Sequence, residues 1–325
     1  MLSRVAENLF WMSRYVERAE NLARLVDVNL QLNFDAPLPV RKQWEPLIAI
    51  SGDEKLFRRR AAGFALREVL VFLTADPAYP NSILSCLQRA RDDARAVREQ
   101  ITTEMWSSLN DLYLKISGEI GRKKWLDAPN ALYDAVKSGG QLFQGATDAT
   151  MAHDEGWNFI QAAKYLERAE KTARIVDVKY HVLLPSPKDV GSPLDFVQWV
   201  AVLKSCSGFD PFCRKHTLRF QLHPIIEFLL HDQIFPRSVS YCLLHAQRAL
   251  HRISDAPLDR PSNGAERRIV RARAAIDGHP TEEILKEGLH ERLEQIQEIC
   301  NAVGDEIHAR YFSPSPDAVR ATGGS

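Results

Sequence analysis

Carboxylate and guanidinium side chains recur at helical spacing near the start of the chain. Glu17, Glu20, Arg24 and Asp27 are separated by three, four and three residues. At the period of an α-helix, these four side chains share an arc of about 80°. Arginines in such an arc could hold a carboxylate or phosphate, and glutamates could orient an amine or a water molecule.

The same charges return 150 positions later in the chain. The segment YVERAENLARLVDV at 15–28 matches YLERAEKTARIVDV at 165–178 at ten of fourteen positions, and only Asn21/Lys171 changes the charge. Retention of the charges indicates that they carry a constraint of their own. The candidate site therefore has five residues from each copy: Glu17, Arg18, Glu20, Arg24, Asp27, Glu167, Arg168, Glu170, Arg174 and Asp177.

Apolar residues on both sides of this charged arc predict that the helix is buried. Buried charges must pair with one another or with a ligand. We favour an ion-pair network that sets the register between the central helices of the two repeats. The alternative is a polar pocket in which Arg24 and Arg174 hold an anion while Glu17 and Glu167 orient an amine or water. The third alternative is a di-metal carboxylate site, but the Glu-x-x-His motif of ferritin-like bundles is absent, and no metal site is predicted.

A second repeated motif, FLxxDxxxPxS, matches at an offset of 156 residues. It places Asp76 and Asp232 at the end of one predicted helix, with Ser82 and Ser238 in the first turn of the next. This arrangement is typical of a helix-turn-helix corner in which Asp or Ser accepts unpaired N–H groups. Asp76 and Asp232 are secondary site candidates if the corner faces the charged helix.

The repeats and the apolar periodicity together predict an all-α protein made of two tandem helical-bundle units packed with pseudo-twofold symmetry. One copy is about 150 residues long, which is the size of an ordinary domain. We assign the first helical repeat to residues 1–150 and the second to 151–312. The remaining residues, 313–325, are rich in Pro, Gly, Ser and Ala and are predicted to be disordered.

The composition excludes several functional classes. Lys plus Arg and Asp plus Glu both total 42, so no net charge attracts the chain to nucleic acid or an anionic membrane. No apolar run approaches the roughly 20 residues of a membrane span. The five cysteines contain no CxxC pair, and the repeat equivalents Cys86 and Cys242 are expected to be small buried residues, which favours a reduced cytoplasm. No nucleotide, hydrolase or zinc motif is present, and no cofactor is predicted.

Three segments resemble the bacterial alpha-E domain family. They are LSRVAENLFWMSRYVERAENLARLVDV, the second ERAEKTARIVDV and its lead-in TMAHDEGWNFIQ. The family is an all-helical domain with a Glu-Arg motif, typically duplicated in tandem, and the likeness extends over residues 1–312. Its motif maps onto Glu17-Arg18 and Glu167-Arg168 in this chain.

The resemblance also implies a functional context. Members of the family tend to be encoded beside ATP-grasp carboxylate–amine ligases, transglutaminase-like proteins and an N-terminal-nucleophile hydrolase. We therefore predict a non-catalytic accessory protein of a peptide or amide-bond synthesis and modification system, binding the ligase or its peptide substrate. The alternative is an enzyme that uses the paired Glu/Arg/Asp cluster on an amide or amino-acid substrate. A small-molecule sensor is the third hypothesis.

Overall fold

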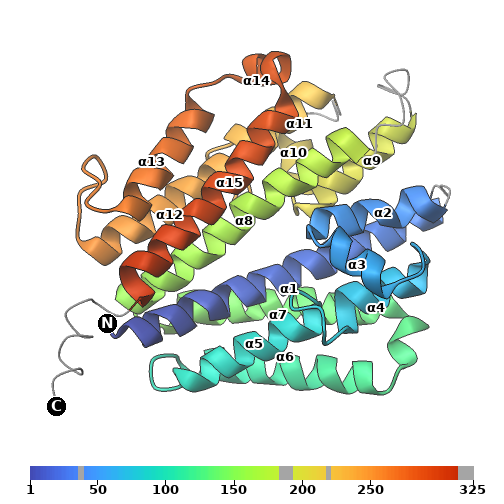
Figure 1. Cartoon of the computed structure of the whole chain (residues 1–325), viewed down its shortest axis with the longest axis horizontal. Coiled ribbons are helices and arrows are strands. Elements are labelled where there is room, and N and C mark those ends of the chain that lie inside the picture. The colour runs from blue at the N-terminus through green and yellow to red at the C-terminus, as the bar shows by residue number, and fades with distance from the viewer. Residues whose placement is uncertain (36–39, 183–192, 217–220, 314–325) are drawn as a thin grey trace.

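The computed structural model describes residues 1–35, 40–182, 193–216 and 221–313, and every regular element in these ranges is a helix (Figure 1). The prediction of an all-α protein is confirmed. Apart from Ser313, the tail that was predicted to be disordered lies outside the described residues. None of the helices in the described ranges is long and apolar enough to cross a membrane.

The helices fall into two series with matching order. The first series runs α1 (Ser3–Asp35), α2 (Val40–Ser51), α3 (Glu54–Arg60), α4 (Leu66–Ala75), α5 (Ile83–Ala96), α6 (Thr103–Gly121), the 3₁₀ turn η1 (Lys124–Leu126) and α7 (Pro129–Thr150). The second runs α8 (Glu155–Val182), α9 (Pro193–Ser205), α10 (Phe209–His216), α11 (Leu222–His231), α12 (Val239–Ser254), α13 (Gly264–Asp277), α14 (Thr281–Glu287), α15 (Leu289–Ile307) and a π-helical turn (His308–Phe312).

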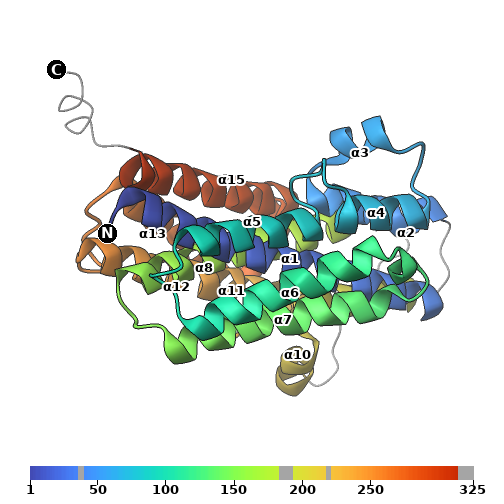
Figure 2. The same cartoon turned by 90° about the horizontal axis from the view of Figure 1, so that it is seen from below.

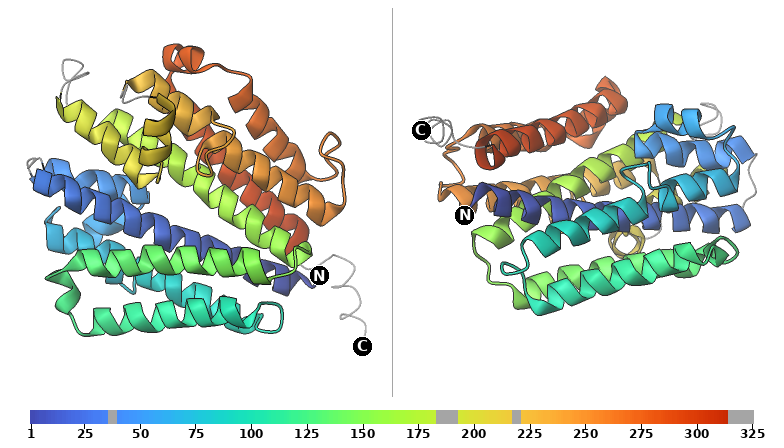
Figure 3. Two further views of the ribbon diagram at one scale, coloured as in Figure 1. Left: turned by 180° about the vertical axis from the view of Figure 1, so that it is seen from behind. Right: turned by 60° about the horizontal axis from the view of Figure 1, so that its bottom comes forward.

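Each series contributes a four-helix bundle. In the first, α1 and α6 both pack against α5 and α7, and in the second α8 and α13 both pack against α12 and α15. The two bundles meet where α1 lies beside α8 in the middle of the molecule (Figure 2 and Figure 3). The short helices cross over, because α2 contacts α8 and α9 contacts α1. Such reciprocal contacts are those that a twofold axis between α1 and α8 would produce.

Small residues let α1 and α8 lie close to their neighbours. Ala19, Ala23 and their counterparts Ala169 and Ala173 are fully buried, which allows close approach between helices. Because both helices are covered on most sides by the other elements, their charged side chains are enclosed as well. Burial of the charged arc is therefore a direct result of placing α1 and α8 at the centre.

The corners predicted from the FLxxDxxxPxS motif are present. Ser82 and Ser238 are the N-caps of α5 and α12, and their side chains accept the N–H groups of residues three positions on. Asp76 and Asp232 follow α4 and α11 and accept N–H groups of the turn between the helices. These bonds satisfy groups that helix ends leave without intrahelical partners.

Candidate functional site

The Glu-Arg pairs of the two repeats exchange partners where α1 meets α8. Glu17 accepts a hydrogen bond from Arg168 at 2.9 Å, and Glu167 accepts one from Arg18 at 2.7 Å. Both glutamates are almost completely buried, with exposed fractions of 1% and 0%. Each repeat thus supplies the charge that neutralises the other, and the two halves of the centre are described in turn.

The half around Glu17 is filled by protein. Arg237, from the turn before α12, donates to Glu17 at 2.8 Å and to Glu20 at 2.8 Å, and also donates to Asn21. Gln144 of α7 donates to both glutamates, at 2.8 and 3.0 Å. Arg24 pairs with Glu20 one helical turn away. We call this cluster of side chains around Glu17 and Glu20 the closed half.

The half around Glu167 is open. Arg14 donates to Glu167 at 2.7 Å beside Arg18, and Glu170 pairs with Arg174 at 2.7 Å and with Lys171 at 3.1 Å. A cavity of about 270 Å³ lies against these side chains. We call the cluster around Glu167 and Glu170 the open half, and the cavity the pocket.

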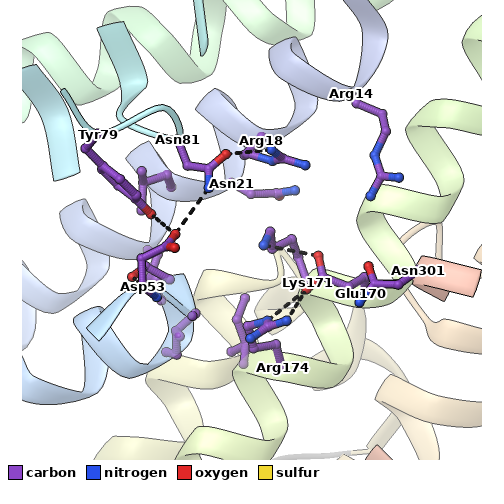
Figure 4. A pocket seen from close by; sticks show the side chains of 16 residues that line it. Arg14, Arg18, Asn21, Asp53, Tyr79, Asn81, Glu170, Lys171, Arg174 and Asn301 are labelled. Atoms are coloured by element: carbon purple, nitrogen blue, oxygen red, sulfur yellow. Dashed lines mark hydrogen bonds and ion pairs between the residues drawn. The ribbon is translucent and has the colours of Figure 1, made fainter. Parts of the chain in front are cut away.

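The pocket has two unlike walls (Figure 4). Arg14, Lys171 and Arg174 lie on one wall, on α1 and α8, and Arg18 of α1 extends from that wall to donate to Asn81. Across the cavity lies a trio that we call the polar trio: Asp53, Tyr79 and Asn81, which come from the two loops that flank α3 and α4.

The polar trio is joined by its own hydrogen bonds. Asp53 accepts from the Tyr79 hydroxyl at 2.8 Å and from the Asn81 amide at 3.2 Å. The Asn81 carbonyl oxygen in turn accepts from Arg18 at 2.7 Å. Burial, reinforced by the negative charge of Asp53, raises the pKa of Tyr79, so its hydroxyl remains a donor. The trio therefore presents a carboxylate to the pocket in a fixed orientation.

The Arg174 guanidinium lies close to the backbone of the loop that carries Asp53, and this contact depends on Gly52. This glycine has a positive φ of 79°, and a Cβ there would lie 2.9 Å from the Arg174 guanidinium. Any larger residue would be strained in this conformation and would push the guanidinium away. The loop that carries Asp53 is thus shaped to leave room for a cation in the pocket wall.

The two halves differ because the two repeats diverge at the residues that line the pocket. At the 156-residue offset, Asn81 corresponds to Arg237, and Arg237 is the side chain that fills the closed half. Asp53 and Tyr79 correspond to Phe209 and Phe235. The polar trio therefore occurs only in the first repeat, which borders the pocket. That repeat has no arginine at the position of Arg237, so no side chain fills the open half in the way that Arg237 fills the closed half.

The pKa values of the central glutamates show that both carboxylates stay ionised. Burial alone would raise the pKa of Glu17, but Arg168 and Arg237 outweigh it and lower the pKa to about 2. Burial is likewise outweighed at Glu167, where Arg18 and Arg14 hold the pKa far below its usual range. These glutamates act as fixed negative charges.

Positive charge exceeds negative charge in both halves. In the open half four cations share the carboxylates of Glu167 and Glu170. In the closed half the excess positive charge makes it easier for Lys164, the counterpart of Arg14, to lose its proton. Burial and the nearby Arg168 lower the pKa of Lys164 to about 8. The open half has a cavity where an external anion could complete the balance, and the closed half is filled by Arg237.

The remaining predicted residues lie away from the pocket. Asp27 pairs with Lys137 at 2.6 Å, and Asp177 with His290 at 2.7 Å, one or two turns further along α1 and α8. Asp76 and Asp232 sit in the corners, where Asp76 pairs with Arg60 at 2.7 Å and Asp232 with Lys215 at 2.7 Å. The corner motif nevertheless contributes to the centre through Asn81 and Arg237.

Several contributing residues were not anticipated from the sequence. The polar trio, Arg14, Lys171, Gln144 and Arg237 were absent from the candidate set, although the difference between Asn81 and Arg237 is visible inside the repeated corner motif. Within the described ranges, no group of three or more His, Cys, Asp or Glu side chains is placed to hold a metal ion. Cys86 and Cys242 are fully buried, as expected, and burial raises the pKa of both thiols.

The chain is similar to known sequences over most of its length. The sequence model of the Alpha-E family, described as a predicted alpha-helical domain with a conserved ER motif, matches residues 1–312. Uncharacterised proteins of Mycobacterium bovis and Mycobacterium tuberculosis are 26% identical over 314 residues, covering 90% of this chain. The chain spans about a third, 34%, of the length of these relatives. No solved structure matched.

Proposed function

The chain belongs to the Alpha-E family, and on that premise we propose that it is a non-catalytic binding protein whose pocket holds an anionic ligand. One observation carries the proposal: four cationic side chains share two carboxylates beside an open cavity of about 270 Å³. Arginines are suited to carboxylate and phosphate groups because their N–H donors form a planar fork. An anion there would accept hydrogen bonds from the pocket wall and reduce the excess positive charge.

Binding accounts for the centre better than catalysis does. A general acid or base works best when its pKa lies near the operating pH. Glu17 has a pKa of about 2, and the pKa of Glu167 is also strongly lowered, since each accepts hydrogen bonds from two arginines. Carboxylates fixed in this way can orient cations but do not readily exchange protons near neutral pH.

We further propose that the protein serves a peptide or amide-bond synthesis and modification system. Its partners would be an ATP-grasp carboxylate–amine ligase and a transglutaminase-like protein, as the family resemblance implies. The matched region forms only about a third of the mycobacterial relatives, and this supports a role in which the domain acts together with other domains or protein chains. The free thiols of all five cysteines fit the cytoplasmic location that we propose.

The repeat provides a matched pair of variants for the pocket. Arg174 lines the pocket and Arg24 is its counterpart in the closed half. We expect Arg174→Gln to weaken binding of glutarate or inorganic phosphate about tenfold in calorimetric titration, and also to lower the melting temperature because it removes a partner of the buried Glu170. Arg24→Gln should lower the melting temperature in the same way, because it removes a buried partner of Glu20, but should leave the affinity unchanged because Arg24 does not line the pocket.

Two results would contradict the proposed pocket. The first is failure of both anions to bind the wild-type chain, and the second is equal loss of affinity in the two variants. The proposed partners are tested separately by purifying the tagged chain from its native host at low salt. Mass spectrometry should then find an ATP-grasp or transglutaminase-like protein in stoichiometric amount, and recovery of the chain without either would refute the accessory role.

A further inference from the structure

The side of the pocket that the polar trio forms carries a negative charge on Asp53. Asp53 receives hydrogen bonds from two neutral groups, the Tyr79 hydroxyl and the Asn81 amide. Within the described ranges, no Lys, Arg or His side chain forms an ion pair with Asp53. A partly buried carboxylate with only neutral partners retains an unmet attraction for a cation.

The fold of the two loops that carry the polar trio does not require this negative charge. The second repeat builds the same corner, with Ser238 as the N-cap of α12, and carries Phe209 and Phe235 where the first carries Asp53 and Tyr79. Its two phenylalanine positions supply apolar packing, with Phe235 stacked on Phe228. The polar trio is thus confined to the copy that borders the cavity, which associates it with the pocket rather than with the architecture.

From these two walls we infer that the pocket takes a dipolar ligand that carries both an anionic group and an ammonium group. The inference rests on the proposed anion-binding function and adds the second group. The anionic end lies against Arg14, Lys171 and Arg174, and the ammonium end lies against Asp53. Amino acids and short peptides have this chemistry, and the cavity of about 270 Å³ has room for a small molecule of this kind.

A series of unbranched probes of increasing length tests the inference without assuming which side chain the natural ligand carries. The probes are 4-aminobutanoate, 5-aminopentanoate and 6-aminohexanoate, each paired with the alkanoate of equal length that lacks the amine. Affinities are measured by calorimetric titration at pH 7.5 and constant ionic strength, because screening weakens charge interactions. At the chain length that spans the pocket, the amine should improve affinity about tenfold, which equals about 1.4 kcal/mol.

The variant Asp53→Asn assigns the effect to one atom group. It keeps the size of the side chain and an acceptor for the Tyr79 hydroxyl but removes the charge. We expect it to abolish the advantage of the amino probes while the plain alkanoates bind at least as well as before. Asp111→Asn, at an exposed position on α6, is the matched control and should retain the full advantage.

The outcomes separate this inference from the proposed function. If alkanoates and amino alkanoates of every length bind equally, or if Asp53→Asn keeps the advantage of the amine, the dipolar ligand is refuted and the anion site remains. If no probe of either series binds and glutarate and phosphate also fail, the proposed function is refuted together with the inference.

Discussion

Replacing Arg237 by asparagine would give the closed half the side chain that the open half has at the equivalent position. Arg237 and its counterpart Asn81 distinguish the closed half from the open half. The Arg237 guanidinium donates hydrogen bonds to Glu17, Glu20 and Asn21 at 2.7 to 2.8 Å. The substitution leaves two buried carboxylates with one cationic partner fewer, and asparagine is too short to replace the guanidinium.

The magnitude follows from two opposing effects. Breaking a buried ion pair by removing one partner typically costs about 3 to 5 kcal/mol. Part of this cost is offset because Arg237 also repels its neighbours: burial and then Arg237 lower the pKa of Arg24. Arg168 and Arg24 remain to pair with Glu17 and Glu20. We therefore expect Arg237→Asn to lower the free energy of unfolding by about 3 kcal/mol, at the lower end of that range.

Urea denaturation followed by circular dichroism measures this change as a shift of the midpoint at constant slope. The control is Arg122→Asn, because Arg122 is 71% exposed and should change stability by less than about 0.5 kcal/mol. A second readout is acid unfolding, which should begin at higher pH in Arg237→Asn because Glu17 loses one of the charges that lower its pKa. If stability and acid unfolding both match the wild type, our account of the closed half is wrong.

Three further predictions concern titratable groups. Folding lowers the pKa of Lys164 from 10.5 to about 8, so between these pH values the unfolded chain holds a proton on Lys164 that the folded chain has lost, and the free energy of unfolding should rise with pH. Lys164→Met should remove this rise, as measured by urea titrations at several pH values. It should also stabilise the protein at pH 7 by about 3 kcal/mol, because the charged lysine is no longer buried. The lowered pKa values of Glu17 and Glu167 contribute stability that is present above about pH 4.5 and is lost as pH falls through the folded values, and Glu17→Gln should flatten the acid limb of a melting-temperature profile. Cys86 and Cys242 should resist a thiol reagent at pH 8 until the protein is unfolded, and labelling of either thiol at the rate of an exposed cysteine would contradict their placement.

Features that depend on local spacing were predictable from the sequence. Apolar periodicity, caps and breakers determine the helices and the corners, because each depends on residues within a few positions of one another. Burial of Glu17 and Glu20 followed from the apolar residues around them on one helix. The internal repeat further indicated that α1 and α8 are equivalent, before any contact between them was known.

The pairing of particular charges was not predictable in this way. Arg237 reaches Glu17 from 220 positions away, and no local pattern links the two. The counterpart of Asp53 in the second repeat is Phe209, so the comparison of repeats that revealed the charged helices did not identify Asp53 as a candidate. The sequence shows that Asn81 and Arg237 differ, but only packing decides that this difference closes one half and leaves a cavity in the other.

The exchange of partners between α1 and α8 bears on what half of this chain could do alone. Residues 1–150 contain Glu17 without Arg168 and Arg18 without Glu167, so a separated unit would bury two charges that it cannot neutralise. Two copies of one such unit could face each other as a homodimer, in which a single interface forms the same Glu–Arg contact twice.

A homodimer of that kind has a restriction that the fused chain escapes. Every substitution in a homodimer appears on both sides of the twofold axis, so an arginine that fills one cavity also fills the symmetry-related cavity. Joining the copies in one polypeptide lets the two positions vary separately, and Asn81 and Arg237 show the result. One half is filled by Arg237, and the other has the cavity that we propose holds a ligand.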